Sequence, residues 1–255
     1  MKYKNILGID FGGSGIKGAP VNTKSGKLLE PRHRIPTPNP ATPEKVVEVV
    51  QELIKHFKWK GPVGIGFPSV VMNGVIKTAA NISDEWIGID AEKMFSTATG
   101  LPVYIINDAD SAGLAEMKFG AGKKVKGTAF LVTVGTGIGS VLFTKGKLVA
   151  NTEIGHMYLS NGKEAEEYAS DAVRQEQDLN WKDWAKRFNE FLLELERLFW
   201  PEVIILGGGV SKRSKDFVKH ININTKLVMA KQKNEAGIIG AALATKIYKK
   251  KEINE

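Results

Sequence analysis

Residues 6–29, ILGIDFGGSGIKGAPVNTKSGKLL, recur in a shorter form as residues 131–149, LVTVGTGIGSVLFTKGKLV. Each copy predicts an apolar strand, a glycine-rich turn, a second strand, a polar turn with Gly-Lys-Leu and a third strand. A supersecondary unit that occurs twice indicates two similar domains. We therefore expect an N-terminal α/β domain over residues 1–110 and a C-terminal α/β domain over residues 111–255, facing each other around a cleft.

Three further apolar runs extend this α/β pattern, namely Val63–Phe67, Val103–Ile106 and Val203–Leu206. Strands that are apolar on both faces are typical of a sheet covered by helices, and such sheets bind ligands beyond the carboxyl ends of their strands. Helices are expected to start near Thr42, Ser111, Asn180 and Asn234, with Thr42 and Asn180 as capping residues. The last helix is expected to pack back on the N-terminal domain.

The composition is that of an ordinary globular protein of 255 residues, with a formal net charge of +8 and no cysteine. The lack of cysteine excludes disulfides, iron–sulfur clusters and cysteine-ligated zinc. No apolar run approaches the roughly 20 residues of a membrane span, and the first residues do not form a secretory signal. We expect a cytoplasmic protein with no membrane partner, whose positive charge serves nucleic acid, an acidic substrate or only solubility.

The two glycine-rich turns, Gly12–Gly15 and Gly135–Gly139, have two interpretations. Glycine is common in hairpin turns because positive φ angles cost it little. Backbone N–H groups without neighbouring Cβ atoms also form concave anion sites, to which Ser14 and Thr136 would add hydroxyl donors. Two matched turns with hydroxyl residues favour this second interpretation, in which they clamp a phosphate chain. Asp10 at the end of the first strand then either bonds the local turn or holds a hydrated Mg²⁺.

Two nucleotide-binding motifs are excluded, and a third glycine-rich segment stays open. Residues 13–18 match G-x-G-x-x-G, but a strand rather than a helix is expected to follow, which excludes a dinucleotide fingerprint. No P-loop sequence G-x-x-x-x-G-K-[ST] is present. Gly207-Gly208-Gly209 is either a tight connection from strand to helix or a close approach to part of a phosphate donor.

Candidate acceptor-binding residues lie on segments that follow apolar runs. Asp108, next to Asn107, is either a helix N-cap or a carboxylate that takes a proton from an alcohol. Glu153 and His156 flank a glycine, and Asn81 lies on a polar loop. Side chains of these kinds hydrogen-bond adjacent hydroxyls, so they indicate a ligand such as a sugar.

In this order the motifs resemble the ROK sugar kinases, a family named for repressor, open reading frame and kinase. The resemblance covers nearly the whole chain and rests on Ile9–Lys17, Asn107-Asp108, Val134–Gly139, Glu153–His156 and Leu206–Gly209. It implies the actin-like ATPase (ribonuclease H-like) fold. Residues 78–82, 86–88, 166–170 and 179–184 are most similar to the branch that phosphorylates glucose with inorganic polyphosphate.

The resemblance also implies a role for each motif residue. Asp108 would be the general base on the 6-hydroxyl of glucose. Sugar binding would involve Asn81, Asn107, Asp108, Glu153, His156 and Glu166, with Ser69 as a further candidate. The phosphate donor, polyphosphate or ATP, would be bound by Asp10, Gly12, Gly13, Ser14, Lys17, Gly135, Thr136, Gly137, Gly207, Gly208 and Gly209. Asp10 would hold Mg²⁺ through water, and the family implies a homodimer.

The chain departs from the family pattern in two places. Many ROK members carry a cysteine-rich zinc loop soon after Glu-x-Gly-His, where this chain has Leu159–Lys163 and no cysteine. Zinc is therefore excluded, and His156 must be oriented by packing and hydrogen bonds alone. Ser69 stands where the family pattern continues with glycine, and its hydroxyl either reaches the sugar or bonds the turn.

Basic residues concentrate in two stretches that we expect to flank the donor end of the cleft. Lys118–Lys126 leads into the second glycine-rich unit, and Lys212–Lys219 follows the triple glycine. A solvated face is the simpler interpretation, whereas a polyanion would follow such a groove electrostatically. The interleaved aromatic residues of a single-strand groove are missing, so no nucleic acid partner is expected.

The alternatives lie within the same family and fold. One is an ATP-dependent ROK kinase for mannose, fructose or N-acetylmannosamine. A sugar-sensing ROK regulator would need a helix-turn-helix segment ahead of the first strand, which starts by Asn5. A nucleotide-driven switch of the actin or Hsp70 type would need a large extra partner domain. The residues favour a polyphosphate-dependent glucokinase.

Overall fold

The computed structural model describes residues 3–80 and 82–252, and the chain divides into two compact units. Unit 1 comprises Met1–Ala115 and Asn234–Glu255, and unit 2 comprises Glu116–Lys233. Both are mixed α/β structures built on one main sheet, as the sequence predicts. The first division falls after Ala115 rather than after residue 110, and the end of the chain belongs to unit 1 rather than to a continuous second half.

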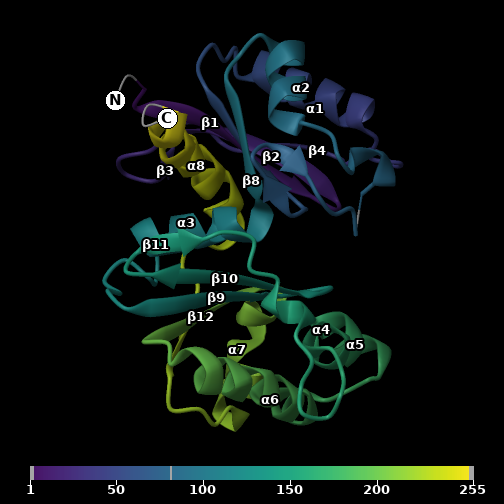
Figure 1. Ribbon diagram of the computed structural model, residues 1–255, viewed down its shortest axis with the longest axis vertical. Coiled ribbons are helices and arrows are strands. Elements are labelled where there is room, and N and C mark those ends of the chain that lie inside the picture. The colour runs from purple at the N-terminus through teal and green to yellow at the C-terminus, as the bar shows by residue number, and fades with distance from the viewer. Residues whose placement is uncertain (1–2, 81, 253–255) are drawn as a thin grey trace. The chain divides into compact units, whose positions relative to one another are not determined.

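The main sheet of unit 1 combines a hairpin with parallel strands (Figure 1). Its strands are β1 (Asn5–Gly12), β2 (Gly15–Asn22), β3 (Lys27–Leu28), β4 (His33–Ile35), β5 (Val63–Phe67) and β8 (Val103–Asn107). Their order is β3-β2-β1-β5-β8, with β4 also on β2, and a separate ribbon pairs β6 (Val71–Met72) with β7 (Val75–Ile76). β1 and β2 are antiparallel, whereas β1, β5 and β8 are parallel.

Helices cover both faces of this sheet (Figure 1). They are α1 (Pro43–His56), α2 (Ala91–Thr99), the first part of α3 (Asp108–Phe119) and α8 (Ala236–Glu252), with one 3-10 turn, η1 (Asp84–Trp86). Successive side chains of a strand point to opposite faces. Leu7 and Ile9 accordingly lie in the core with α1 and α2, while the intervening Gly8 contacts α8.

Helix α8 lies against the sheet at backbone distance. A Cβ atom at Gly8 would overlap the carbonyl oxygen of Ile238, and one at Gly64 would overlap the carbonyl oxygen of Ala241. Any side chain at these two strand positions would therefore push the helix away. This close packing explains why the sequence of the last helix is rich in alanine and glycine.

The main sheet of unit 2 repeats the hairpin-plus-parallel arrangement (Figure 1). Its strands are β9 (Thr128–Val134), β10 (Ile138–Thr144), β11 (Lys147–Val149), β12 (Val203–Gly208) and β13 (Lys226–Met229), in the order β11-β10-β9-β12-β13. β9, β10 and β11 form antiparallel pairs, and β12 pairs in parallel with both β9 and β13. The repeat predicted from the sequence is therefore confirmed as two antiparallel meanders.

A large apolar core joins this sheet to the helices of unit 2. The helices are α4 (Ala165–Ala169), α5 (Asp171–Glu176), α6 (Trp181–Phe199) and α7 (Ser214–Phe217), with short 3-10 turns η2 (Ile154–His156), η3 (Gly209–Arg213), η4 (Val218–His220) and, where the chain leaves the unit, η5 (Lys233–Glu235). Trp184, Phe188 and Leu192 of α6 are fully buried in this core. None of the described helices is both long and apolar enough to cross a membrane.

The helix starts show where local signals hold and where they fail. Asn180 caps α6 as predicted, because its Oδ1 accepts the Asp183 N–H at 3.0 Å. Thr42 precedes α1, but its side chain makes no capping hydrogen bond. The helix expected from Ser111 begins earlier, at Asp108, so this prediction was wrong by one turn.

Gly64→Ala is expected to lower the free energy of unfolding by about 1–3 kcal/mol, because a Cβ atom has no room against the backbone of α8. Equilibrium unfolding in urea, followed by circular dichroism, measures the change. Gly18→Ala in β2 is the matched control, since its Cβ would approach its nearest neighbour, Leu53, to 3.4 Å. An equal loss in both variants would show that the helix contact does not set the cost.

Candidate active site

The first glycine-rich turn connects β1 to β2 in unit 1. Thr37 Oγ1 donates a hydrogen bond of 2.6 Å to Gly12 O, and the Arg34 guanidinium donates one to Ser14 O. Gly13 and Ser14 are exposed, and a Cβ atom at Gly13 would have no neighbour within 4 Å. The turn is thus held through its carbonyl oxygens while its tip stays open, as an anion site requires.

Asp10 lies near the carboxyl end of β1, where α8 encloses it. Its side chain is 19% exposed, and Lys17 Nζ lies 3.5 Å from its carboxylate. A Cβ atom at Gly237 would lie 2.6 Å from Asp10 Cγ, so the glycine leaves the room that the carboxylate occupies. Burial raises the pKa of Asp10, and the positive charges of Lys17 and Arg32 oppose this rise. Asp10 is therefore an enclosed carboxylate with a cationic neighbour.

The same helix joins the Asp10 region to the start of α3. Ser111 Oγ donates a hydrogen bond of 2.6 Å to Gly237 O, and a Cβ atom at Gly240 would overlap Ser111 O. Ser111 follows Asp108 by one turn of α3. The positions of the two predicted functional carboxylates, Asp10 and Asp108, therefore depend on one packed framework.

Asn107 and Ser69 are engaged inside unit 1. Asn107 Nδ2 donates to Ser69 O at 3.0 Å and its Oδ1 accepts the Asp110 N–H at 3.0 Å, so Asn107 caps α3. Ser69 Oγ donates to Thr78 O at 2.6 Å. The two residues are 8% and 5% exposed. For Ser69 these contacts favour the interpretation in which its hydroxyl bonds the turn.

Asp108 is the first residue of α3 and remains partly exposed. Its Oδ1 accepts the Ala109 N–H at 2.8 Å. A Cβ atom at Gly66 of β5 would lie 3.3 Å from the Ser111 side chain and 3.7 Å from Asp108 Cα, so β5 packs closely against the first turn of α3. The amino-terminal end of a helix stabilises a negative charge, and a carboxylate base acts in its charged form. Asn81, the weaker sugar-binding candidate, lies outside the described residues.

The second glycine-rich turn connects β9 to β10 in unit 2. Gly135 N–H donates to Gly137 O at 3.0 Å, which closes the turn. Gly135 O accepts the N–H groups of Asp171 and Ala172, at 3.0 and 3.3 Å, from the start of α5. Thr136 at the tip is exposed. This turn is therefore also held through a carbonyl oxygen with its tip left open.

Glu166 of α4 bonds the end of this turn, and the sequence did not predict this contact. Its Oε2 accepts the Ile138 N–H at 2.7 Å. A Cβ atom at Gly137 would lie 2.7 Å from Glu166 Cδ, so the glycine makes room for the carboxylate. A residue assigned to the sugar by resemblance is thus bonded to the backbone of the second glycine-rich turn.

Glu153 and His156 lie at the two ends of the Glu-x-Gly-His segment. Both are exposed, whereas Gly155 between them is buried and a Cβ atom there would overlap Ile138 O. Partial burial raises the pKa of Glu153, the charge of Glu166 adds to the rise, and the charge of His156 opposes it. The packing of Gly155 thus fixes the segment, and the side chains of Glu153 and His156 lie at the surface on either side of it.

The triple glycine spans the end of β12 and the first residue of η3, beside the second turn. Gly207 and Gly208 pair with Thr133 and Val134, the last residues of β9. Gly208 has a φ of +76°, and a Cβ atom there would overlap the backbone of Val134. Gly208 and Gly209 are exposed. The fold thus requires glycine most clearly at Gly208. This residue lies at the exposed edge next to the second turn.

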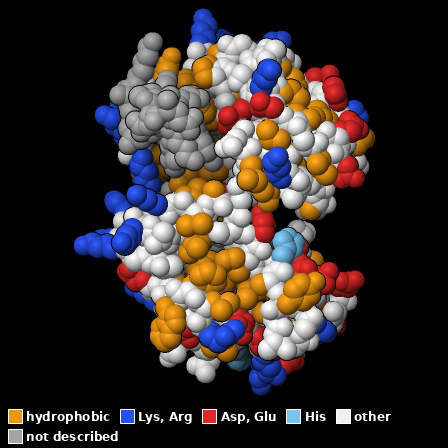
Figure 2. Space-filling view, viewed as in Figure 1, with side chains coloured by type: hydrophobic (Ala, Val, Ile, Leu, Met, Phe, Trp, Pro, Cys, Tyr) orange, Lys and Arg blue, Asp and Glu red, His pale blue; other side chains and the backbone are white. Residues whose placement is uncertain are grey.

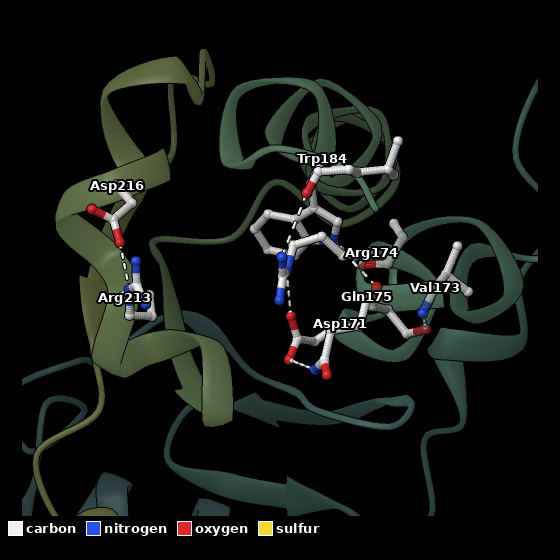
Figure 3. A network of polar contacts seen from close by, with 10 residues as sticks. Asp171, Val173, Arg174, Gln175, Trp184, Arg213 and Asp216 are labelled. Carbon is white, nitrogen blue, oxygen red and sulfur yellow. Dashed lines mark hydrogen bonds and ion pairs between the residues drawn. The ribbon is translucent and has the colours of Figure 1, made fainter. Parts of the chain in front are cut away.

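A cluster of arginines and acids extends from this edge (Figure 3). Arg174 Nε donates to Asp171 at 2.6 Å, and Arg213 Nε donates to Asp216 at 2.5 Å. The Cζ atoms of the two arginines lie 4.2 and 5.6 Å from the centroid of the Trp181 ring, Arg174 being the closer. Sequence reasoning found Arg213 but not Arg174, because only the fold brings their segments together.

Lys126, in the first of the two basic stretches, lies at the opposite end of β12 from Gly208. Its N–H donates to Glu202 at 3.3 Å, just before β12 begins, whereas Gly208 ends that strand. At about 3.3 Å per residue, the six residue steps from Glu202 to Gly208 separate these two points by some 20 Å. Figure 2 shows basic side chains in small groups rather than in one continuous stripe on the face drawn.

Residues 6–175 match the ROK family. The chain belongs to this family, so the resemblance read from the motifs is confirmed. The ROK sugar kinases have the actin-like ATPase fold, and the glucokinase of Streptomyces griseus, solved with glucose and AMPPNP, shares it. The TM-score is 0.76 at 24% identity, over 94% of this chain and 98% of that chain.

Relatives with higher identity cover almost the whole chain. The polyphosphate glucokinase of Mycobacterium tuberculosis (strain CDC 1551 / Oshkosh) is 44% identical, over 94% of this chain and 90% of that protein. The polyphosphate glucokinase of Mycobacterium leprae (strain TN) is 42% identical, over 94% and 74%. The crystal structure of inorganic polyphosphate/ATP-glucomannokinase from Arthrobacter sp. strain KM has a TM-score of 0.90 and 42% identity, over 96% of this chain and 100% of that chain.

Asp10→Asn is expected to stabilise the fold at neutral pH. Because burial raises the pKa of Asp10 in the folded state, its contribution to stability is full below the unfolded-state pKa and is lost as pH rises through the folded-state pKa. The neutral amide removes this loss. Urea unfolding at pH 4 and pH 7 measures it, with the exposed Asp178→Asn as the control. A variant less stable than the wild type at pH 7 would contradict the prediction.

Proposed function

We propose that this chain is a kinase that transfers a phosphoryl group from inorganic polyphosphate, with ATP as a second donor, to the 6-hydroxyl of glucose. The observation that carries the proposal is the identity of 42–44% to polyphosphate-using glucokinases over 94–96% of the chain. The open tips of the two glycine-rich turns and the partly exposed Asp108 carboxylate supply the chemistry that such a transfer needs.

Asp108 is the proposed general base. Its carboxylate accepts the proton of the 6-hydroxyl as that oxygen forms a bond to the terminal phosphorus of the donor. The bond between this phosphorus and the bridging oxygen breaks, and the shortened polyphosphate leaves with the electron pair. Asn107 serves this step indirectly, because its two hydrogen bonds fix the end of β8 and the first turn of α3. Such a positioned base contributes about 10²–10⁴-fold to a rate.

The sugar hydroxyls are assigned to Glu153, His156 and Glu166 of unit 2, together with Asn81 and Asn107 of unit 1. Carboxylates accept hydrogen bonds from hydroxyl groups, and an imidazole donates or accepts one according to its protonation. The raised pKa of Glu153 reflects a partly desolvated acid, which is typical of residues at binding sites.

The donor phosphates are assigned to the two glycine-rich turns, with Lys17 beside the first turn and the edge at Gly207–Gly209 beside the second. Phosphoryl transfer needs alignment and charge stabilisation rather than covalent chemistry from the protein. Mg²⁺ suits a site with one carboxylate, waters and substrate phosphates, and Asp10 offers that one carboxylate next to the open turn at Gly13. When bound, Mg²⁺ would neutralise developing charge on the phosphate oxygens.

The rest of a long donor is assigned to the basic segment Lys212–Lys219. This segment follows Gly208, which pairs with Val134 next to the second turn. Arg213 of the segment and Arg174 both lie close to the Trp181 ring. Phe217 stacks on Trp181 with 5.7 Å between the ring centroids, and the two guanidinium groups also lie close to the Trp181 ring. These neighbours leave little of the ring for a base to stack on. The segment therefore suits a chain of phosphates better than a stacked base.

The finer points of the proposal follow the relatives. The glucomannokinase name of the Arthrobacter enzyme favours mannose as a second acceptor. We further propose that the enzyme is a homodimer, as the family resemblance implies, and that it works in the cytoplasm.

Asp108→Asn is expected to reduce kcat at least 100-fold with both donors, because the amide cannot accept the proton of the 6-hydroxyl. A coupled assay for glucose 6-phosphate, run separately with polyphosphate and with ATP, measures it. Asp178→Asn, an exposed residue of unit 2, is the matched control. An Asp108 variant with near-normal turnover would refute the assignment of the base, and a wild type inactive with both donors would refute the function.

The KM for polyphosphate is expected to rise more steeply with salt than the KM for ATP, since each ionic contact to the chain releases counterions. The double variant Lys212→Gln/Lys215→Gln should flatten this dependence for polyphosphate. Lys123→Gln/Lys124→Gln is the matched control from the other basic stretch. The same salt response for both donors, or an equal effect of both double variants, would contradict the proposed path.

A further inference from the structure

A short closed loop follows the Glu-x-Gly-His segment in unit 2. Tyr158 forms an antiparallel bridge with Glu164, and Leu159 N–H donates to Lys163 O at 2.9 Å. Ala165 N–H donates to Met157 O at 2.9 Å. These backbone hydrogen bonds, with one from Lys163 N–H to Asn161 Oδ1 at 2.9 Å, set the shape of the loop, which returns the chain to the side of His156.

The side chain that the loop returns is Glu164. Its Oε1 lies 2.5 Å from His156 Nδ1, a distance typical of a charge-assisted hydrogen bond. The Glu164 side chain is 20% exposed, whereas that of His156 is 57% exposed. A carboxylate accepts only, so Nδ1 carries the proton and Nε2 is the ring nitrogen left for a ligand.

We propose that Glu164 is the positioning residue of the sugar site, which fixes the ring of His156 and its Nδ1 proton so that Nε2 faces a sugar hydroxyl. This inference rests on the proposed function, because it takes His156 to contact the sugar. Glu164 itself touches the imidazole and not the substrate. An exposed ion pair adds little to stability, so orientation of the ring is the better explanation for this contact.

The charges around the ring set its response to pH. The hydrogen bond to Glu164 is the main cause that raises the pKa of His156, burial opposes the rise, and the charges of Glu164, Glu166 and Glu153 add to it. Below this pKa the ring is charged and Nε2–H donates to a sugar oxygen. Above it Nε2 only accepts. Glucose affinity should therefore fall as pH rises through the pKa of His156, at a higher pH than a free imidazole would give.

Two substitutions separate charge from orientation. Glu164→Gln keeps an oxygen that accepts the Nδ1–H but removes the negative charge, whereas Glu164→Ala removes both. Glu167→Gln, an exposed acid on the same helix segment, is the matched control. If Glu164→Ala fails to fold, Glu164→Gln alone carries the test.

The first measurement is the titration of the imidazole by NMR in the sugar-free protein. The chain has only four histidines, and His156→Asn identifies the signal of interest. The pKa of His156 should lie above the usual value in the wild type and in Glu167→Gln, and should fall in both Glu164 variants. An unchanged titration in Glu164→Gln would overturn the inference, because the contact would then not exist in solution.

The second measurement is the pH dependence of kcat and of the KM for glucose with saturating polyphosphate. At pH 7.5 the KM for glucose should rise about tenfold in Glu164→Ala and less than that in Glu164→Gln. At pH 5.5 Glu164→Gln should approach the wild type, since its ring is then charged. The kcat should stay within about twofold, as expected for a residue that acts on binding.

The remaining outcomes are equally decisive. A pH profile of KM that does not move with the pKa of His156, or a fall in kcat at constant KM, would overturn the positioning role. Failure of the proposed function would appear differently, as a wild type that neither phosphorylates nor binds glucose, while the NMR titration would still report the Glu164 contact.

Discussion

The contact between the backbone of α8 and the sheet of unit 1 is the constraint on which this half of the site depends. Two strand glycines, Gly8 and Gly64, allow the helix to rest on the strands without intervening side chains. A helix held at that distance brings Gly237 against the Asp10 carboxylate and accepts the Ser111 hydroxyl. The burial that raises the pKa of Asp10 and the placement of the first turn of α3 are thus two results of one packing contact. Moving the helix outward by the width of a methyl group would alter both.

Much of this fold follows from the sequence, because it depends on local patterns. The strands were readable from short apolar runs, the two meanders from the repeat, and the cap of α6 from Asn180. The start of α3 was misplaced although its signal was present: Asn107 is a strong capping residue, and its side chain bonds Asp110. Asn107 is both the last residue of β8 and the cap of α3. Because the apolar run before it predicts a strand that ends there, its second role was not recognised.

The site was predicted less completely, because its parts meet through space. Asp10, Asp108 and the glycine turns were found from motif positions. Glu164 carried no signal, since it lies in a polar loop without periodicity and acts on a residue eight positions away. The contact of Glu166 with Ile138 depends on the packing of α4 against the second glycine-rich turn, which no local pattern encodes. One carboxylate therefore bonds the predicted phosphate turn and also acts through its charge on Glu153 and His156 of the predicted sugar segment.

Unit 1 is discontinuous in sequence, with all of unit 2 inserted between Ala115 and Asn234. On the ribosome, unit 2 is therefore completely synthesised before α8 exists, and the glycine face of β1 and β5 stays uncovered until the last residues of the helix emerge. Domains generally fold as they are made, from the N-terminal side onward. Here the order is reversed for the final step: the half that is started first is finished last. During that interval the sheet face that α8 later covers is exposed on the nascent chain.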